Sequence, residues 1–309
     1  MVYNKHLVLV VCALLTFGAC SGGGSDDSGE TPTPNQPSTP EAKLPITIST
    51  TMLSRATDSN FEVGDCIGLF VVNHNADGSV VALKTSGNHV DNMKFTYNAT
   101  WTPATQIYWS DNKTHADFYL YYPYTTSISS VEAMPWTLNA DQSSVANYKA
   151  SDLLIGKTSD VAPTQDAVKL DAKHVMSQML ITVAPGNGFT DATLAAATVS
   201  VKVNGLKTQG TVNLSTGTAT AMGDAATVTP LKEDGTYKAL VMPQTVSKGN
   251  LITVDVDGRD YNLSTDQDFN FEAGKRLKFT VTVSKTSNGV NVNISKWEDD
   301  GKDYGGTAE

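Results

Sequence analysis

Cys66-Ile-Gly-Leu-Phe-Val-Val72 is the stretch that decides the fold class, because it is almost continuously apolar between two polar neighbours. Asp117-Phe-Tyr-Leu-Tyr-Tyr-Pro-Tyr124 is a second run of this kind, and its proline ends strand pairing because proline has no N–H to donate. Short apolar runs are typical of strands that are covered on both faces. Aromatic residues alternate between the two faces of the second run, which favours a core strand over a glycan-stacking platform.

Further short segments of alternating or apolar residues predict more strands on both sides of these two. They are Ile46–Thr50, Met179–Ala184, Thr198–Val203, Tyr237–Met242, Leu251–Val256, Leu277–Val283 and Val290–Ile294. No segment keeps a helical period over several turns, and Ala192–Ala197 is the best candidate for a short helix. We therefore predict an all-β chain.

Asp-Gly and Asn-Gly pairs predict tight hairpins, since both central residues of a type I′ turn need positive φ. The pairs are Asp77-Gly78, Asn204-Gly205, Asp234-Gly235, Asp257-Gly258 and Asn288-Gly289. The best internal boundary is Pro185-Gly186-Asn187-Gly188. We expect two antiparallel β-sandwich domains in tandem, residues 46–185 and 186–309, because many short antiparallel strands pack readily as sandwiches.

The first twenty residues have the pattern of a lipoprotein signal peptide. Lys5 precedes an apolar stretch, Leu7–Phe17, that is too short for a permanent membrane helix. Two small residues stand before Cys20, and this junction resembles the lipobox of bacterial lipoproteins, with Phe17 departing from its usual aliphatic residue. We expect removal of residues 1–19 and lipid attachment at Cys20. The alternative is an ordinary cleaved signal with an incidental cysteine.

Residues 20–45 are rich in Gly, Ser, Thr and Pro, a composition that predicts an extended tether between Cys20 and the first strand. The chain has a formal net charge of −10 and no cluster of Lys or Arg. This charge pattern argues against nucleic acid as a partner and against docking on anionic lipid by charge. We expect membrane association through the lipid on Cys20.

The sequence contains no catalytic or metal-binding constellation. Cys66 is the single cysteine left once the signal peptide and Cys20 are accounted for, so no intramolecular disulfide is expected and a small buried strand residue is the simplest interpretation. The histidines are scattered, and we expect His174 to make a structural hydrogen bond. Asp255–Asp260 begins like a calcium loop, but its glycine comes too early and no Glu closes it. We predict no enzymatic activity, no cofactor and no metal.

Ser54-Arg55-Ala56-Thr57 lies between the first expected strand and the segment that leads into Cys66. A single Arg in a polar context just after a strand is accessible to a trypsin-like or Arg-specific protease. We therefore take the bond between Arg55 and Ala56 as a candidate cleavage site.

Taken together, an ordered set of motifs resembles the Bacteroidia fimbrillins, in particular the Mfa-like fimbrillin family of lipoprotein pilins. The set covers most of the chain after Ile46, and its order is more specific than any one piece. The pieces are Ser54–Thr57, Phe61–Phe70, Ile107-Tyr108-Trp109, Phe118–Tyr124, Asp152-Leu153-Leu154, His174, Gly210–Gly217, Val241-Met242-Pro243-Gln244, Gly274-Lys275 and Trp297.

The resemblance implies two transthyretin-like β-sandwich domains, no enzymatic activity, and export to the cell surface as an outer membrane lipoprotein. In the polymerising members an Arg-specific protease removes the N-terminal segment with its first strand. Carried onto this chain, the cut falls between Arg55 and Ala56, and Ile46–Ser54 is the displaced strand. Losing such a strand would expose unpaired backbone and an apolar groove that a strand of another subunit can fill.

The function that follows is a structural or accessory subunit of a cell-surface fimbria, with other fimbrial subunits as partners in a homo- or heteropolymer. The donor strand would have to include Val290–Ile294, because Glu298–Glu309 lacks apolar alternation, and this leaves a tip or anchor role open. The alternative function is a monomeric surface lipoprotein that binds a glycan or another host or bacterial surface ligand through its loops.

Overall fold

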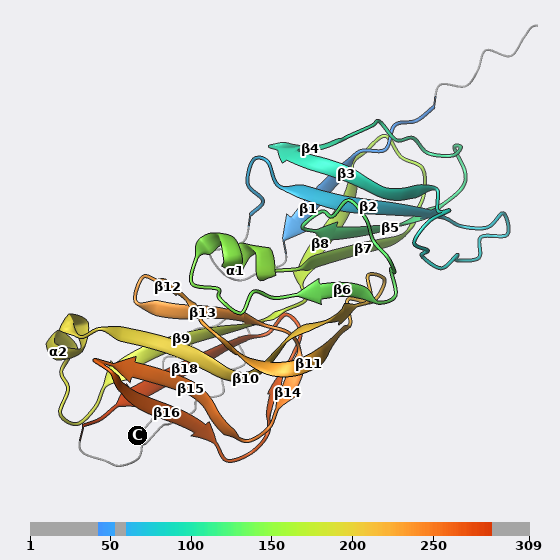
Figure 1. Ribbon diagram of the computed structural model, residues 1–309. Coiled ribbons are helices and arrows are strands. Elements are labelled where there is room, and N and C mark those ends of the chain that lie inside the picture. The colour runs from blue at the N-terminus through green and yellow to red at the C-terminus, as the bar shows by residue number, and fades with distance from the viewer. Residues whose placement is uncertain (1–42, 53–59, 286–309) are drawn as a thin grey trace, which may run out of the picture. The chain divides into compact units, whose positions relative to one another are not determined.

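The computed structural model describes residues 43–52 and 60–285, so Cys20, Arg55 and Ala56 lie outside the described residues, as do Val290–Ile294 and Trp297. The described chain is all-β, which confirms the predicted fold class (Figure 1). Within these residues, eighteen strands are joined by loops and two short helices. Neither of these helices has the length and apolar composition needed to cross a membrane.

Strands from the first half of the chain form one seven-stranded sheet in the order β1-β8-β7-β5-β2-β3-β4 (Figure 1). Its members are β1 (Ile48–Met52), β2 (Cys66–Asn73), β3 (Val90–Asn98), β4 (Thr100–Pro103), β5 (Ala116–Tyr122), β7 (Leu154–Val161) and β8 (Val168–His174). The two apolar runs of the sequence become the neighbouring strands β2 and β5 near the middle of this sheet. Neighbours pair antiparallel throughout, except that β1 pairs parallel with β8.

The seven-stranded sheet curls so that its two edge strands meet. Trp101 on β4 donates a hydrogen bond of 2.9 Å from Nε1 to Oγ1 of Thr50 on β1, although these strands stand at opposite ends of the sheet order. The curled sheet encloses one hydrophobic cluster, to which each of its seven strands contributes. Its fully buried members include Ile67, Leu69, Val71, Phe95, Phe118, Leu120, Leu154 and Leu170.

Strands from the second half form a five-stranded, a four-stranded and a two-stranded sheet. The five-stranded sheet has the order β11-β10-β15-β16, and β6 (Met134–Thr137) also pairs with β10. The four-stranded sheet has the order β12-β13-β9-β18, and β14 pairs with β17. The bounds are β9 (Ser177–Pro185), β10 (Val199–Val212), β11 (Ala219–Val228), β12 (Leu231–Glu233), β13 (Thr236–Val241), β14 (Gln244–Val246), β15 (Gly249–Val256), β16 (Arg259–Thr265), β17 (Phe269–Phe271) and β18 (Arg276–Val283).

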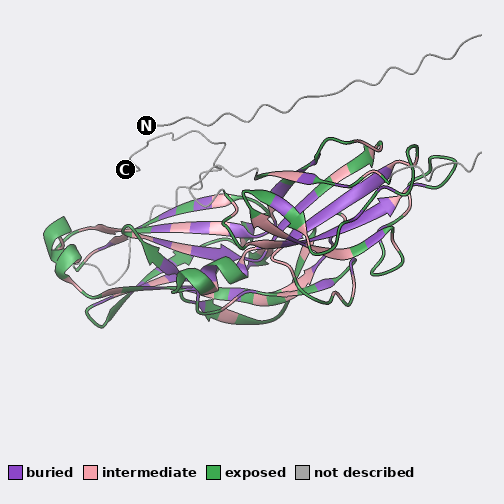
Figure 2. Ribbon diagram, turned by 90° about the horizontal axis from the view of Figure 1, so that it is seen from above, coloured by how far each residue is buried: buried purple, intermediate pink, exposed green. Residues whose placement is uncertain are grey.

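The five-stranded and four-stranded sheets share one hydrophobic cluster, with Val203 and Val254 from the first and Ile181 and Val281 from the second. Figure 2 shows the consequence as bands of buried and more exposed residues along these strands, whereas β2 and β5 of the seven-stranded sheet are almost continuously buried. Such alternation is expected when one face of a sheet packs on a core and the other meets water.

A third cluster joins residues from both halves of the chain. It contains Phe70 and Tyr121 from the other face of the seven-stranded sheet, together with Leu214 and Leu240. The helix α1 (Val145–Ser151) adds Tyr148 to it and is capped by Ser144, whose side chain accepts a hydrogen bond from Asn147 N–H. The second helix, α2 (Asp191–Ala196), begins with a capping box at Thr190 and lies where a short helix was predicted.

The expected domain boundary falls at the end of β9. That strand pairs with β13 and β18, so the strands that follow His174 belong to the sheets of the second half. The division of the chain into two sandwich domains at Pro185 stays a prediction.

The hairpin predictions have mixed outcomes. Asp234-Gly235 joins β12 to β13 and Asp257-Gly258 joins β15 to β16, all four residues with positive φ, as predicted. Asn204-Gly205 does not form a hairpin but lies within β10, where the pairing register with β11 shifts. Pairing with β11 on one side and β15 on the other keeps β10 continuous, so Gly205 serves a bulge. Asp77-Gly78 lies in the long loop between β2 and β3 rather than in a tight hairpin, and Asn288-Gly289 lies outside the described residues.

Candidate assembly site around the first strand

The first strand lies in the described part of the site, while the expected cleavage point does not. β1 pairs with β8 in a parallel register that runs from Ile48 opposite Val168 to Met52 opposite Ala172. Just before β1, Val168 N–H donates a hydrogen bond of 2.9 Å to Thr47 O. β1 is therefore attached along one side as an edge strand.

A second backbone segment holds the residues that lead into β1. Ile46 N–H donates to Ile107 O at 2.9 Å, and Trp109 N–H donates to Leu44 O at 2.9 Å, around an antiparallel bridge between Pro45 and Tyr108. Residues 44–47 thus have backbone partners in β8 and in the 107–109 segment. The sequence drew attention to Ile107-Tyr108-Trp109 as part of a resemblance, but gave no sign of this pairing.

The side chains of the segment alternate between the core and the solvent. Ile46 and Ile48 are 1% and 6% exposed and belong to the cluster inside the curled sheet, whereas Thr47 and Thr51 are exposed. Burying two isoleucine side chains stabilises by about 3–6 kcal/mol in total. The first strand therefore fills a groove, and its removal would expose part of the apolar core together with the free edge of β8.

Trp101 contacts the chain on both sides of residues 53–59. Before them, Thr50 accepts the hydrogen bond from the Trp101 indole. After them, Phe61 packs against Trp101 with ring centroids 4.9 Å apart and against Tyr122 at 5.5 Å. Arg55 and Ala56, the candidate cleavage residues, lie between these two attachment points in the sequence and outside the described residues.

The residues after Phe61 are held by polar contacts as well. Glu62 N–H donates to Asp65 Oδ2 at 2.7 Å, and Lys149 Nζ lies 2.7 Å from Glu62 Oε1. Tyr122 OH donates to Asp65 Oδ1 at 3.1 Å. Burial raises the pKa of Tyr122 above its ordinary value, and the nearby Asp65 carboxylate raises it further, so the phenol stays a donor.

Two residues weighed for chemistry have structural roles. Cys66 begins β2 half-buried, and its Sγ donates to Gly64 O at 3.3 Å and lies 3.6 Å from Thr96 Oγ1. His174 Nδ1 lies 3.0 Å from Asp152 Oδ1, the structural hydrogen bond that was predicted. Across residues 43–52 and 60–285, His, Cys, Asp and Glu side chains form no group of three placed to hold a metal ion.

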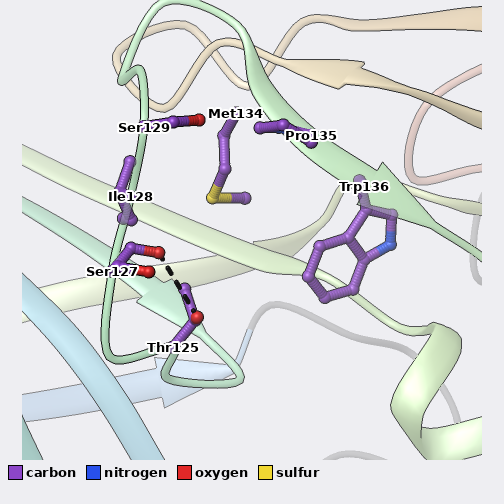
Figure 3. A pocket seen from close by; sticks show the side chains of 7 residues that line it. All are labelled: Thr125, Ser127, Ile128, Ser129, Met134, Pro135 and Trp136. Carbon is purple, nitrogen blue, oxygen red and sulfur yellow. Dashed lines mark hydrogen bonds between the residues drawn. The ribbon is translucent and has the colours of Figure 1, made fainter.

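A small pocket lies apart from β1, between the loop after β5 and strand β6. Its volume is about 260 Å³ and its lining combines hydroxyl and apolar side chains. Figure 3 shows Met134 projecting between Ile128 and Trp136, with Ser127 and Thr125 below Ile128 in this view. Thr125 Oγ1 donates to Ser127 O at 3.4 Å, and the lining carries no charged group among its seven residues.

The model of the fimbrillin-like family matches residues 54–297. The chain belongs to the fimbrillin-like family. This confirms the resemblance on which the sequence interpretation rested. The matched region begins one residue before Arg55. It includes all the described strands except β1, the edge strand of the seven-stranded sheet.

Relatives and solved structures agree with fimbrillin-like membership. A Bacteroides uniformis protein provisionally named fimbrium subunit Fim1C is 30% identical over 305 residues, covering 93% of this chain and 94% of that protein. A crystal structure provisionally described as a cell adhesion protein of Bacteroides uniformis has a TM-score of 0.62 and 25% identity, covering 82% of this fimbrillin-like chain and 99% of that one. A similarly described Bacteroides ovatus structure has a TM-score of 0.67 at 17% identity, covers 84% of this chain and 98% of that one, and supports the fold alone.

Proposed function

We propose that this chain is a structural or accessory subunit of a cell-surface fimbria, assembled by strand complementation after its first strand has been removed. Membership of the fimbrillin-like family and the relative named as a fimbrium subunit support the fimbrial role. The role is structural rather than catalytic.

The observation that carries the proposal is the position of β1. This strand is the parallel edge strand of its sheet and ends just before the segment that contains Arg55. It buries Ile48 in the core, and the residues that lead into it bury Ile46 there. A strand held in this way can be exchanged for another extended segment, because its backbone partners and apolar pockets belong to the rest of the fold.

Cleavage between Arg55 and Ala56 would separate β1 from the domain at one defined place. The new N-terminal segment would stay attached through Phe61, which packs on Trp101 and Tyr122. Contacts of β8 with the departing strand would become available to a strand of another subunit. Strand exchange would therefore leave the rest of the seven-stranded sheet in place.

In this proposal, the lipid attached at Cys20 carries the subunit to the cell surface. The lipid and the tether of residues 20–45 bring the subunit to the outer face of the outer membrane, and the cut at Arg55 frees it from both. Without the cut, the same lipid would keep the subunit as an anchor.

The proposal is tested by treating the purified chain with an Arg-specific protease and following its oligomeric state. We expect a new N-terminus at Ala56 and a ladder of oligomers. If this chain polymerises only with other fimbrial subunits, the ladder should form when those subunits are added. The Arg55→Gln variant should stay intact and monomeric, and Arg259→Gln, a change at the exposed first residue of β16, should behave as the unmodified chain. A chain that is cut at Arg55 and still stays monomeric with every partner subunit would contradict strand complementation.

The alternative function is a monomeric surface lipoprotein that binds a glycan or a host ligand. The pocket between Ile128 and Trp136 is the observation that favours it, since it joins an aromatic ring to several hydroxyl groups. An uncut, lipidated monomer that binds immobilised glycans and loses that binding in Trp136→Ala would support this alternative.

A further inference from the structure

We propose that Trp101 makes the groove of β1 selective for a strand with a hydrogen-bond acceptor, Ser or Thr, at the position of Thr50. The inference rests on the proposed function, because it concerns the strand that takes the place of β1. It also implies a preference between two possible occupants. A strand from a different subunit should bind the groove better than the alternating segment Val290–Ile294 of this chain.

The indole N–H of Trp101 is a buried donor with a defined partner. Trp101 is 8% exposed, and its Nε1 lies 2.9 Å from Thr50 Oγ1. A tryptophan side chain offers one donor and no acceptor, so it has to find an acceptor when it is buried. In the described part of the chain, that acceptor is the Thr50 hydroxyl.

Neighbouring aromatic rings fix the orientation of this indole. Phe61 meets it edge-on, with ring centroids 4.9 Å apart and planes at 79°, and Tyr97 lies 5.1 Å away. An indole packed between two rings cannot turn toward solvent without losing these contacts. The donor therefore keeps its direction when β1 leaves, and it meets whatever side chain an incoming strand places there.

The inward positions of the strand have different requirements. Ile46 and Ile48 fill apolar space, and any aliphatic side chain of similar volume would serve there. Thr50, two residues further along the same face, meets a polar atom instead. The occupant that fits the groove thus has the pattern aliphatic, any, aliphatic, any, Ser or Thr.

A valine at the third inward position would fit sterically but would leave the indole N–H without a partner. An unsatisfied buried donor weakens an interaction by roughly 5- to 150-fold. The same contact also fixes the register, because a slip of two residues moves the hydroxyl away from Trp101, and a slip of one turns the aliphatic side chains outward.

The alternating segment Val290-Asn-Val-Asn-Ile294 of this chain does not have this pattern. With Val290 and Val292 in the two aliphatic positions, Ile294 would face Trp101, and in the reversed direction Val290 would face it. Neither side chain accepts a hydrogen bond. A strand from another subunit that carries Ser or Thr at this place is therefore the better occupant.

A double-mutant cycle in the intact chain tests the recognition contact. We expect Thr50→Val to lower the folding equilibrium constant by roughly 5- to 150-fold, and to have little effect when Trp101→Phe has already removed the donor. Thr47→Val, at an exposed position of the same segment, is the matched control and should change little in either background. Equal effects of Thr50→Val with and without Trp101→Phe would overturn the inference.

Strand selection is tested on protein that has been cut after Arg55, with fluorescent peptides competing for the groove. The peptides carry residues 44–52 unchanged, with Thr50→Val, or with Thr47→Val, and a fourth carries residues 289–297. We expect the unchanged and Thr47→Val peptides to bind alike, and the Thr50→Val and 289–297 peptides to bind roughly 5- to 150-fold more weakly. The discrimination between the Thr and Val peptides should disappear in Trp101→Phe.

Equal binding of the unchanged and Thr50→Val peptides would overturn the role of Trp101 while leaving strand exchange intact. If no peptide enters the groove, strand exchange itself is contradicted, and the cycle in the intact chain still decides what Trp101 recognises.

Discussion

Phe61 packs edge-on against Trp101, with ring centroids 4.9 Å apart, although Phe61 follows residues 53–59 and the Thr50 partner of the same indole precedes them. One tryptophan therefore binds the chain on both sides of the expected cleavage site. A cut at Arg55 would separate the two contacts, because the Thr50 contact would leave with β1 and the Phe61 contact would remain. In the proposed assembly, the Phe61 contact would hold the chain after the cut to Trp101 once the first strand has left.

Removing the Phe61 ring should weaken this attachment. We expect Phe61→Ala to lower the free energy of unfolding by about 2 kcal/mol, less than for a fully buried phenylalanine because Phe61 is half-buried. Urea unfolding measures the change, and Val63→Ala, at a residue that is 76% exposed, is the control that should cost less than about 0.5 kcal/mol. An equal loss in both variants would mean that Phe61 does not anchor this segment.

Ile48 on β1 and Ile46 just before it should provide most of the apolar contact that holds the first strand in place. We expect Ile46→Ala to destabilise the intact chain by about 2–5 kcal/mol, because Ile46 is 1% exposed inside the curled sheet. The same change should speed the release of the N-terminal fragment after cleavage at Arg55. Thr51→Ala, at an exposed position of β1, should leave both quantities nearly unchanged, and a release rate that is equal in the two variants would show that the core contacts do not hold the strand.

The buried carboxylate of Asp117 makes the stability of the seven-stranded sheet depend on pH. Asp117 accepts a hydrogen bond of 2.9 Å from Asp160 N–H, and His74 Nε2 lies 2.8 Å from the same oxygen. Burial alone would raise the pKa of Asp117, but these hydrogen bonds and the nearby Lys157 outweigh burial and hold the pKa below its ordinary value of 3.8. The unfolded chain therefore takes up the proton first as the pH falls.

The stability that this contact provides should be complete above about pH 5 and should be lost progressively below about pH 4. We expect Asp117→Asn to lower stability at pH 7 and to flatten its decline in acid, as measured by urea midpoints between pH 7 and pH 3. Asp224→Asn, a change on exposed β11, is the surface control. Parallel pH curves for the unmodified chain and Asp117→Asn would contradict this assignment.

A glycine in the middle of β2 gives room to a tyrosine on β5. A Cβ atom at Gly68 would overlap the ring of Tyr121, which is 1% exposed and donates from its OH to Asn92 Oδ1 at 2.6 Å. We expect Gly68→Ala to destabilise by about 1–3 kcal/mol through overpacking. In a Tyr121→Val background the same substitution should cost much less in thermal or urea unfolding, and additive losses would show that the ring is not the obstacle.

The sequence allowed prediction of the elements whose environment is local. The apolar runs of β2 and β5 and the turns at Asp234-Gly235 and Asp257-Gly258 could be predicted, because periodicity and positive φ are properties of neighbouring residues. Asn204-Gly205 carried the same local signal, but pairing with two long strands makes it a bulge. Its outcome depended on residues that lie far away in the sequence.

The central contact of the candidate site could not be predicted. Thr50 and Trp101 lie at opposite edges of the sheet order and meet because the sheet curls, a property of all seven strands together. The alternation of Ile46 and Ile48 did predict a first strand. Its parallel pairing with β8 and the added partners at Ile107 and Trp109 depend on tertiary structure that no local pattern encodes.

The most direct test of the account is mass spectrometry of the N-terminus in fimbriae that have been sheared from the cell surface. We predict that this subunit, when it is present in the assembled fraction, begins at Ala56 and lacks β1, while uncut chains that carry lipid on Cys20 remain with the membrane. Assembled subunits that retain an acylated Cys20 and the intact Arg55–Ala56 bond would contradict assembly by replacement of the first strand.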